Sequence, residues 1–534
     1  MKTIYKSLIA AIVLMPTLSS CVEEVFPQGS TVTEGQLGES AEATESLVFG
    51  MTSYFNNIGI LGRDLSYDWG YGSLMHMRDV MTEQMSIQES GYDWYSSWSQ
   101  CTYIGPNYAS TQFIWNFYTK LVLTTNNAIA AINPETATGQ QLCYLGIAYA
   151  FRANHYLDMA RMYEYLPTDV TSPITPEGND VTYYTVPIVT QETTEEESRK
   201  NYRAKREDMY EFILEDLQHA EEYIQEGTVP SKNQPNLAVV YGLYARLFMW
   251  VEDYPNAAKY ARLAIDNFSG YPTTQEQWLD LTTGFNSIST PSWMWGSSQI
   301  KEDSSVQSRY DNWTSWVSNE ALFGYTGLEG GPIMMINKAS YDRINNADFR
   351  KLSYIAPKGS ELSGKEPVID PSFRTSLPTY SSLKFRPAQG NVSDYLTGAA
   401  SDYPLMRVEE MYFIEAEAVE HSNPGQGKAL LESFMQTYRY SSYTCTSANV
   451  IEEIFFQKAI ELWGEGQTYF DLKRLGYSVK RNYDGTNFYS LTAINTTGRP
   501  AWLNFCFVQT EPNNNEGLRG WNNPDPSDLY DTNL

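Results

Sequence analysis

The chain has 534 residues, and its 64 acidic side chains outnumber its 37 basic side chains, which gives a formal charge of −27 at pH 7. This excess argues against nucleic-acid binding and against electrostatic adsorption to an anionic membrane, because both need a cationic surface. A single core rarely grows beyond about 300 residues, so we expect several domains or one body built from repeats.

The chain opens with the three parts of a secretory signal. Lys2 and Lys6 precede an apolar run at 8–15 that is too short to span a bilayer, and the segment 18–21 reads Leu-Ser-Ser-Cys. This order resembles the lipobox of bacterial lipoproteins, in which the signal is cut before the cysteine and the cysteine carries a lipid. An ordinary signal peptide in which Cys21 stands by chance is the alternative.

The resemblance to lipoproteins implies a signal peptide over residues 1–20 and a lipid on Cys21. Residues 21–40 are rich in Glu, Gly, Ser and Thr, which is typical of a flexible tether. Glu23 and Glu24 directly after the cysteine resemble the signal for surface display in lipoproteins of Bacteroides-like bacteria.

Apolar side chains recur at helical spacing over much of the remaining chain. Leu142, Leu145, Tyr149, Tyr156 and Met159 are three, four or seven residues apart, which indicates one face of a helix rather than a strand. The same pattern predicts helices over 112–132, 142–163, 205–224, 237–252, 254–268, 404–421, 425–438 and 449–475.

One helix pair has the spacing of a tetratricopeptide repeat. Residues 241–248 match the first-helix pattern, and Ala257 and Ala264 follow where the second helix needs small side chains. Residues 253–255 supply the turn between them. A lone pair cannot bury its own apolar face, so we predict a stack of tetratricopeptide-like pairs. An unrelated helical bundle is the alternative.

The helical pattern fades in two longer stretches and one shorter stretch, which become rich in Gly, Ser, Pro or Asn. We therefore expect a helical scaffold over 41–270 and 401–480, with a smaller irregular part at 59–108. A loop-rich insertion with short strands is expected over 271–400, and a loop-rich C-terminal segment over 481–534.

Two segments carry the most specific pattern, namely 403–418 (YPLMRVEEMYFIEAEA) and 461–475 (ELWGEGQTYFDLKRL). Together with the lipobox they resemble the SusD/RagB family of outer-membrane nutrient-binding lipoproteins. The chain departs from the family at Thr468, where an Arg is frequent, and in the blurred closing pattern at 508–513. The resemblance implies a mostly α fold, with tetratricopeptide-like helical pairs as a scaffold and a variable, mixed insertion that carries the ligand site.

The resemblance also implies a function. Family members sit on a SusC-like TonB-dependent transporter in the outer membrane, bind glycans or in some cases peptides, and pass them to the transporter. We therefore expect a lipid-anchored cell-surface protein that binds an oligosaccharide or polysaccharide, with a peptide ligand as the alternative. Neither a nucleic-acid partner nor an enzymatic activity is expected.

A glycoside hydrolase is the enzyme class that most needs weighing. Such an enzyme needs two carboxylates about 5 to 9.5 Å apart on either side of one bond. Glu461 and Glu465 share a helix face, and Glu415 and Glu417 lie on another predicted helix, but spacing alone does not place either pair around a ligand. For Glu465, between two glycines, a structural role is favoured. Patterns for nucleophilic, metal or nucleotide chemistry are absent.

Aromatic residues gather in the irregular stretches, beside Ser, Asn and Asp. Flat aromatic rings stack on the apolar faces of sugars, and polar neighbours bind the hydroxyl groups. The positions also resemble those at which family members keep binding aromatics. Core packing is the alternative for each ring, although the Ser and Gln neighbours of Trp98 predict an exposed side chain. The predicted ligand-binding residues are Trp94, Tyr95, Trp98, Trp293, Trp295, Trp313, Trp316 and Tyr325.

Cysteine and histidine offer little chemistry. The four cysteines beyond Cys21 lack CxxC spacing and are too few for a disulfide framework, so buried free thiols are favoured over disulfides. Only four His are present, and none lies near another, which argues against a His-based metal site. No cofactor is expected besides the covalent lipid, and a bound Ca²⁺ in an Asp/Asn-rich loop stays open. The four cysteines are Cys101, Cys143, Cys445 and Cys506.

Overall fold

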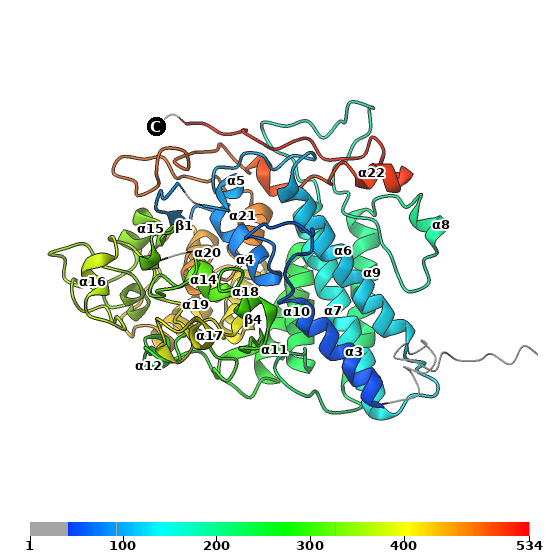
Figure 1. Ribbon diagram of the computed structural model, residues 1–534, viewed down its shortest axis with the longest axis horizontal. Coiled ribbons are helices and arrows are strands. Elements are labelled where there is room, and N and C mark those ends of the chain that lie inside the picture. The colour runs from blue at the N-terminus through cyan, green and yellow to red at the C-terminus, as the bar shows by residue number, and fades with distance from the viewer. Residues whose placement is uncertain (1–40, 92, 326, 533–534) are drawn as a thin grey trace, which may run out of the picture.

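The computed structural model describes residues 41–91, 93–325 and 327–532 (Figure 1). The expected signal peptide at 1–20, the lipid on Cys21 and the tether over 21–40 therefore lie outside the described residues. Within the described part, no helix combines the length and the apolar character that crossing a membrane requires.

Long helices form a continuous stack, in which each helix packs on the next one along the chain. The stack fills the right half of Figure 1 and continues behind the centre. This arrangement confirms the expected mostly α, tetratricopeptide-like scaffold. Its members are α3 (Ala41–Tyr54), α6 (Ala109–Ala130), α7 (Gly139–Tyr163), α9 (Arg206–Ile224), α10 (Leu237–Trp250), α11 (Tyr254–Asp266), α18 (Val408–Ser422), α19 (Gln426–Tyr438), α20 (Val450–Glu461) and α21 (Thr468–Leu475).

The pair α10–α11 forms as its sequence predicts. The Asp253 side chain accepts a hydrogen bond from the backbone N–H of Asn256 and so caps α11. Ala257 and Ala264 are fully buried, which lets the two helices approach closely. The Tyr260 ring fills the remaining space and stacks on Tyr244, with 4.4 Å between ring centroids.

Helix α7 packs directly against α9, although a long loop separates the two helices in the sequence. Thr138 and Gln141 form a capping box at the start of α7. Gly146 lies against α9 so closely that a Cβ atom there would stand 2.7 Å from the Ile224 nitrogen. A helix glycine ordinarily costs about 1 kcal/mol, so its use here reflects close packing of the two helices.

Two predicted helices differ from the structure. The helix expected over 404–421 begins only at Val408, because Tyr403–Arg407 form strand β4 and pair antiparallel with β2 (Trp293–Ser297). The helix expected over 449–475 breaks into α20 and α21. Gly464 and Gly466 adopt φ of 78° and 68° between them, a left-handed backbone that ends the first helix.

Most of the shorter elements lie in the left half of Figure 1, whereas α8 and α22 lie on its right side, and the C-terminal segment runs along the upper edge. Strand β1 (Met85–Ile87) pairs antiparallel with β3 (Met334–Ile336). The short α-helices are α4 (Tyr71–Val80), α5 (Ser96–Ser99), α8 (Glu195–Ser198), α12 (Gln275–Trp278), α13 (Ser304–Gln307), α14 (Trp313–Val317), α15 (Lys338–Arg343), α16 (Phe373–Ser376), α17 (Tyr395–Gly398) and α22 (Glu511–Asn514). The 3₁₀ helices are η1 (Gly327–Glu329), η2 (Phe349–Ser353), η3 (Ala388–Gly390), η4 (Ala501–Leu503) and η5 (Glu516–Leu518).

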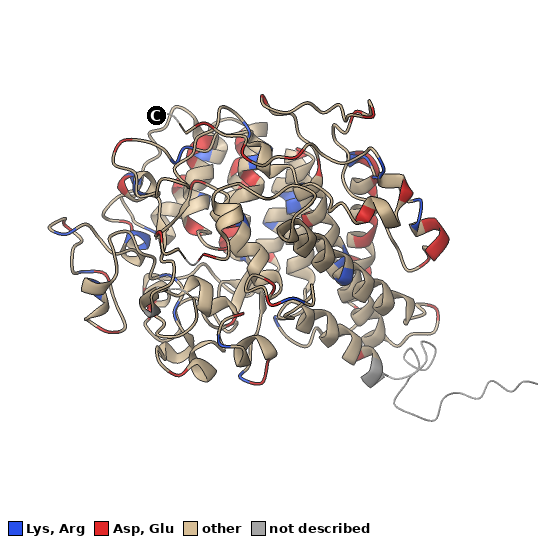
Figure 2. Ribbon diagram, turned by 45° about the horizontal axis from the view of Figure 1, so that its top comes forward, with Lys and Arg blue, Asp and Glu red and all other residues tan. Residues whose placement is uncertain are grey.

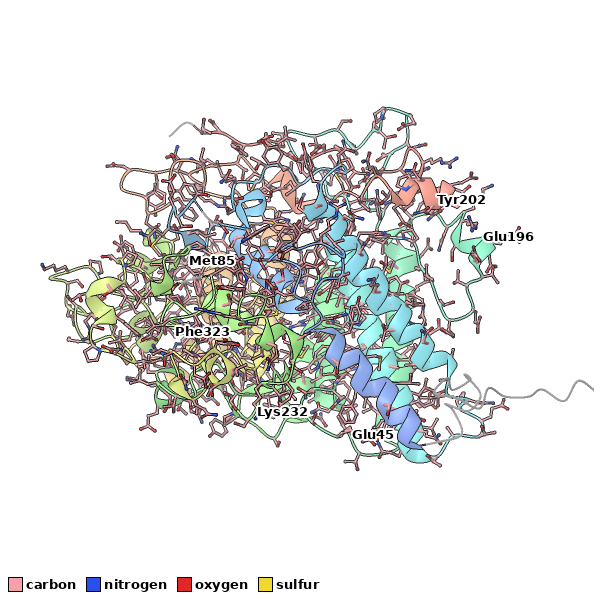
Figure 3. The ribbon with its side chains drawn as sticks, viewed as in Figure 1. Glu45, Met85, Glu196, Tyr202, Lys232 and Phe323 are labelled. Carbon is pink, nitrogen blue, oxygen red and sulfur yellow. The ribbon has the colours of Figure 1, made fainter. Side chains whose placement is uncertain are left out.

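The two halves present different surfaces. On the helical side, α8 carries Glu195, Glu196 and Glu197 and stands out as an acidic projection in Figure 2. Figure 3 places Glu196 and Tyr202 at the periphery of that side, whereas Phe323 lies among the packed side chains of the loop-rich side. Phe323 is buried in a small satellite core with Val306, Ala321 and Ala399, so the loop-rich half has apolar packing of its own. The division into scaffold and insertion at the predicted boundaries stays a prediction.

The two most specific sequence segments meet in a buried ion-pair cluster. Arg407, at the end of β4, donates hydrogen bonds to Glu465 at 2.8 Å and to Glu461 at 3.2 Å. Arg439 reaches Glu461 at 2.6 Å, and Lys384 reaches Glu465 at 2.7 Å. We call this cluster the ion-pair centre. It consists of four basic and four acidic side chains, which are Arg350, Lys384, Arg407, Arg439, Asp348, Glu409, Glu461 and Glu465.

Candidate functional site

The structure brings together aromatic residues from two distant parts of the chain. Helix α4 contacts both α5 and α14, and the ring of Tyr95 meets Trp316 edge to face, with 4.8 Å between centroids. Trp98 lies 5.5 Å from Tyr95 and packs against Tyr67 at 4.9 Å. All four rings are buried, so they form a rigid layer beneath the surface.

A second aromatic layer lies on top of the first and is open to solvent. Tyr325 stacks on Trp316, with 4.7 Å between centroids and 22° between ring planes. Tyr310 packs 5.2 Å from Tyr325 and is 40% exposed. Trp94 is half-buried and directly precedes the buried Tyr95. We call the packed pair Tyr310 and Tyr325 the aromatic surface site, and Trp94 is a separate candidate because it keeps an accessible surface.

Polar groups surround the aromatic surface site. The Ser66 Oγ and the Tyr325 hydroxyl are hydrogen-bonded at 2.8 Å. Asp311 is next to Tyr310, and its Oδ1 is buried without a hydrogen-bond partner among the described residues. Burial raises the pKa of Asp311 to about 6. This oxygen could accept a hydrogen bond from a ligand hydroxyl once a side-chain movement exposes it.

Asp93 directly precedes Trp94 in the sequence, and its carboxylate already accepts hydrogen bonds. Its carboxylate accepts the backbone N–H of Tyr95 at 2.9 Å and the Ser99 hydroxyl at 3.5 Å. Burial raises the pKa of Asp93 to about 6, against the lowering effect of these bonds. The carboxylate therefore holds the turn that presents Trp94.

The sequence analysis missed Tyr310, although it lies only three residues before Trp313, because the tryptophans were taken as the main signal of this stretch. Among the predicted ligand-binding residues, Trp94 and Tyr325 keep an accessible surface. The other six have at most 1% of their surface exposed, so none offers a face to a ligand in this structure. They are Tyr95, Trp98, Trp293, Trp295, Trp313 and Trp316.

The expected exposure of Trp98 is wrong, since this side chain has no exposed surface. Its neighbours Ser96, Ser97 and Gln100 are only half-buried, but the short helix α5 turns the indole ring inward onto Tyr67. The polarity of the neighbouring residues therefore did not predict that the Trp98 side chain points into the core. Direct ligand contact by the six buried rings stays a prediction, and it would require these rings to become exposed.

The tryptophans of β2 and α14 serve packing. Trp295 meets Phe151 edge to face at 5.4 Å, and its indole N–H donates to the Asn233 carbonyl at 2.9 Å. Trp313 stacks on Tyr403 at 5.1 Å between centroids. Both lie in the core beside the β2–β4 pair, so they stabilise the junction between the helical stack and the loop-rich half.

The carboxylates considered for hydrolysis are held by basic side chains. Glu461 is fully buried and Glu465 is nearly so, and both belong to the ion-pair centre. Glu415 pairs with Arg262, and Glu417 pairs with Arg474 at 2.5 Å. This geometry agrees with the structural role favoured for Glu465.

The described part of the chain contains four cysteines, and its potential metal ligands are scattered. Over that part, no group of three or more His, Cys, Asp or Glu side chains is arranged to hold a metal ion. The favoured free thiols are confirmed, and all four are buried at Cys101, Cys143, Cys445 and Cys506.

Comparisons with known proteins agree on one family. A model described as the SusD family matches residues 358–518, and a second model, described as starch-binding and associating with the outer membrane, matches residues 51–249. Among curated proteins, no sequence matches the chain.

Solved structures share the fold at low sequence identity. A SusD-like carbohydrate-binding protein from Bacteroides vulgatus has a TM-score of 0.69 and 20% identity, over 90% of this chain and 97% of the other. A SusD superfamily protein from Bacteroides thetaiotaomicron has a TM-score of 0.68 and 16% identity, over 91% of this chain and 100% of the other. A SusD-like protein from Bacteroides fragilis has a TM-score of 0.65 and 15% identity, over 91% of this chain and 97% of the other.

Proposed function

Because the chain belongs to the SusD/RagB family, we propose that it captures an oligosaccharide at the cell surface and passes it, chemically unchanged, to a TonB-dependent transporter. The observation that carries this proposal is the aromatic surface site. Tyr325 rests on the buried Trp316 and carries the partly open Tyr310, next to Asp311 in the chain.

The chemistry of the site favours a neutral sugar. Aromatic rings bind the C–H faces of pyranose rings, and a rigid base keeps the ordering cost of binding low. Asp311 is suited to accept a hydrogen bond from a sugar hydroxyl, whereas an acidic sugar would place like charges together. We therefore assign neutral glycans to the aromatic surface site in preference to acidic ones.

We also propose how the protein is attached to the membrane and which protein it works with. A lipid on Cys21 would anchor the protein in the outer membrane, and the tether over 21–40 would let it sit on a SusC-like transporter. The family model that names outer-membrane association supports this location. Modest affinity suits such a role, since release to the transporter must follow capture.

A binding screen tests the proposal. The purified protein is run through native gels that contain neutral plant, host or microbial polysaccharides, and the same samples are analysed for cleavage products. We expect retardation by at least one neutral glycan and no products. Cleavage would overturn the non-catalytic reading, and retardation by peptides alone would favour the peptide-binding alternative.

Matched variants then locate the site. Trp94→Ala and Tyr325→Ala should each weaken glycan binding about tenfold, because an aromatic contact contributes about 1–3 kcal/mol. Tyr202→Ala is the control, since Tyr202 is 56% exposed and lies at the periphery of the helical side (Figure 3). Equal binding by all three variants would remove the aromatic surface site from the proposal.

A further inference from the structure

A second hollow, distant in sequence from the aromatic surface site, has a basic lining. Its cavity volume is about 110 Å³, and it opens to solvent where the ends of α7, α10 and α21 meet the C-terminal segment. We call it the basic hollow, and its defining residues are Arg161, Glu164, Arg206, Trp250, Lys473 and Arg499. Its whole lining contains seven basic and four acidic side chains, in a chain whose net charge is −27.

Most of the basic side chains in the lining are neutralised. Arg246 pairs with Glu410 at 2.6 Å, and Lys458 pairs with Asp471 at 2.8 Å. Arg206 reaches Glu164 at 2.5 Å. Arg161 pairs with Asp158 outside the lining at 2.7 Å, and that carboxylate also serves Arg78. These pairs account for the carboxylates that face inward.

Lys473 and Arg499 have no carboxylate within ion-pair distance in the described part of the chain. The Lys473 ammonium donates only to the carbonyls of Met162 and Glu164, at 2.9 and 2.7 Å. Arg499 donates to the carbonyls of Lys473 and Pro167, at 2.7 and 2.6 Å. Lys473 is buried, and Arg499 is half-buried.

Like charges meet around Lys473. Burial lowers the pKa of its ammonium well below the ordinary value, and repulsion from Arg499, Arg206 and Arg203 lowers it further, while Glu164 opposes. Carbonyl oxygens carry only partial charge and do not neutralise two cations. An anion in the hollow would relieve this repulsion.

A third basic side chain has unused hydrogen-bonding capacity. Arg474 lines the same hollow with 8% of its side chain exposed, and its Nη2 pairs with Glu417. Its Nη1 is buried without a hydrogen-bond partner among the described residues. A buried donor left unsatisfied costs about 1–3 kcal/mol, which a bound oxyanion would recover.

The wall of the hollow also has flat apolar parts. The Arg161 guanidinium lies 3.6 Å from the centroid of the Phe470 ring, and the Trp250 indole N–H donates to Glu164 at 2.9 Å. Tyr183, 44% exposed, stands at the mouth. Such a wall suits the ring of a small organic anion better than a bare inorganic ion.

We propose that the basic hollow binds a small organic oxyanion, a carboxylate or phosphate on a hydroxylated ring, with Lys473 and Arg499 as its counter-ions. The site is separate from the neutral-glycan site, and it stands whether or not the aromatic surface site binds glycan. Acidic monosaccharides are the ligand class with this chemistry.

Calorimetry on the intact protein tests the proposal. The probes are D-glucuronate, glucose 6-phosphate, inorganic phosphate and, as the neutral control, D-glucose. We expect one-to-one binding of glucuronate or of glucose 6-phosphate, and no binding of glucose. Preference between the first two probes identifies the carboxylate or the phosphate source. Binding of inorganic phosphate alone, or of none of the anions, would overturn the proposal.

Variants separate the hollow from the rest of the surface. Arg499→Gln should weaken binding at least tenfold, whereas the exposed Arg519→Gln should leave it unchanged. Glu252→Gln at the exposed mouth removes a negative charge and should strengthen binding about twofold even if Arg499→Gln folds poorly. Undiminished binding by Arg499→Gln, or no gain with Glu252→Gln, would count against the hollow as the site.

Discussion

The ion-pair centre and the aromatic surface site differ in whether their charged side chains have a counter-ion and in whether they are exposed. In the ion-pair centre, four basic side chains meet four acidic ones, and all eight are buried. In the aromatic surface site, the rings are backed on one side and open on the other, and Asp311 keeps an unused oxygen. A closed set of pairs stabilises a fold, whereas a half-open set can accept a ligand. The most specific sequence segments thus mark the stabilising region rather than the binding region.

Glu461→Ala should have the largest effect. Its carboxylate bonds to Arg350 at 3.0 Å and to Arg407 and Arg439 at 3.2 and 2.6 Å, so its removal leaves four buried basic side chains with three carboxylates. We expect a loss of about 3–5 kcal/mol in the free energy of unfolding, measured with urea. Glu452→Ala on the exposed face of α20 is the control and should change it by less than about 0.5 kcal/mol. A small effect of Glu461→Ala would mean that the centre is not stabilising.

Trp98→Ala should act on stability. Truncation of this buried ring should lower the free energy of unfolding by about 3 kcal/mol, because a cavity opens beneath Tyr67 and Tyr95. Trp94→Ala, four residues earlier and half-buried, should lower it by about 1 kcal/mol or less. Urea unfolding of the two variants measures the contrast, and equal losses would contradict the division into a buried and an open layer.

Lowering the pH should destabilise the buried aromatic layer that supports the aromatic surface site. His76 packs 4.5 Å from Tyr95, and burial lowers its pKa to about 3. Its folded-state pKa is below the unfolded value near 6.5, so its contribution is fully present above pH 6.5 and is lost as pH falls toward 3. Between pH 7.5 and 5.5 we expect a loss of about 1.4 kcal/mol from this group.

The measurement compares unfolding of the wild type with that of His76→Leu at both pH values. Asp93 and Asp311, whose raised pKa values act in the opposite direction, are common to both proteins and cancel in the difference. A stability difference that does not change with pH would show that His76 is not held neutral in the core.

Tyr325→Phe should give the smallest effect. The variant loses the hydrogen bond with Ser66 but keeps the ring on Trp316, so the free energy of unfolding should fall by about 1 kcal/mol or less. Glycan affinity, measured by the same gels, should stay within about threefold of the wild type. A loss as large as that of Tyr325→Ala would assign the contact to the hydroxyl rather than to the ring.

Much of the helical scaffold was predictable because its signals are local. The alanines of α11 and the Asp253 cap act within one helix pair, and their spacing alone predicts the contact. The break between α20 and α21 was missed, although Gly464 and Gly466 were visible. Glycine is tolerated inside helices, and here the left-handed backbone accompanies close packing against Phe385 and Met75.

The candidate site was predicted in part. Trp94 and Tyr325 stand where the sequence placed binding aromatics, but which rings of each cluster face outward could not be deduced. Trp94 and Trp98 both have polar neighbours in the sequence. Trp98 is buried because it packs against Tyr67 and Tyr95, whereas Trp94 is only half-buried. Tyr310 belongs to the site because its ring packs against Tyr325, a contact that no local sequence pattern predicted.

By itself, the sequence determined most of the long helices and the turn between α10 and α11, because periodicity and turns depend on residues a few positions apart, and two of its segments carried the resemblance to the family. The tertiary structure decided which tryptophans are core, which carboxylates are neutralised and which cations are left without a counter-ion. Each of these outcomes depends on contacts between segments tens to hundreds of residues apart, such as Lys384 with Glu465 and Tyr95 with Trp316. Burial and charge balance are properties of those contacts, so they could not be read from either segment alone.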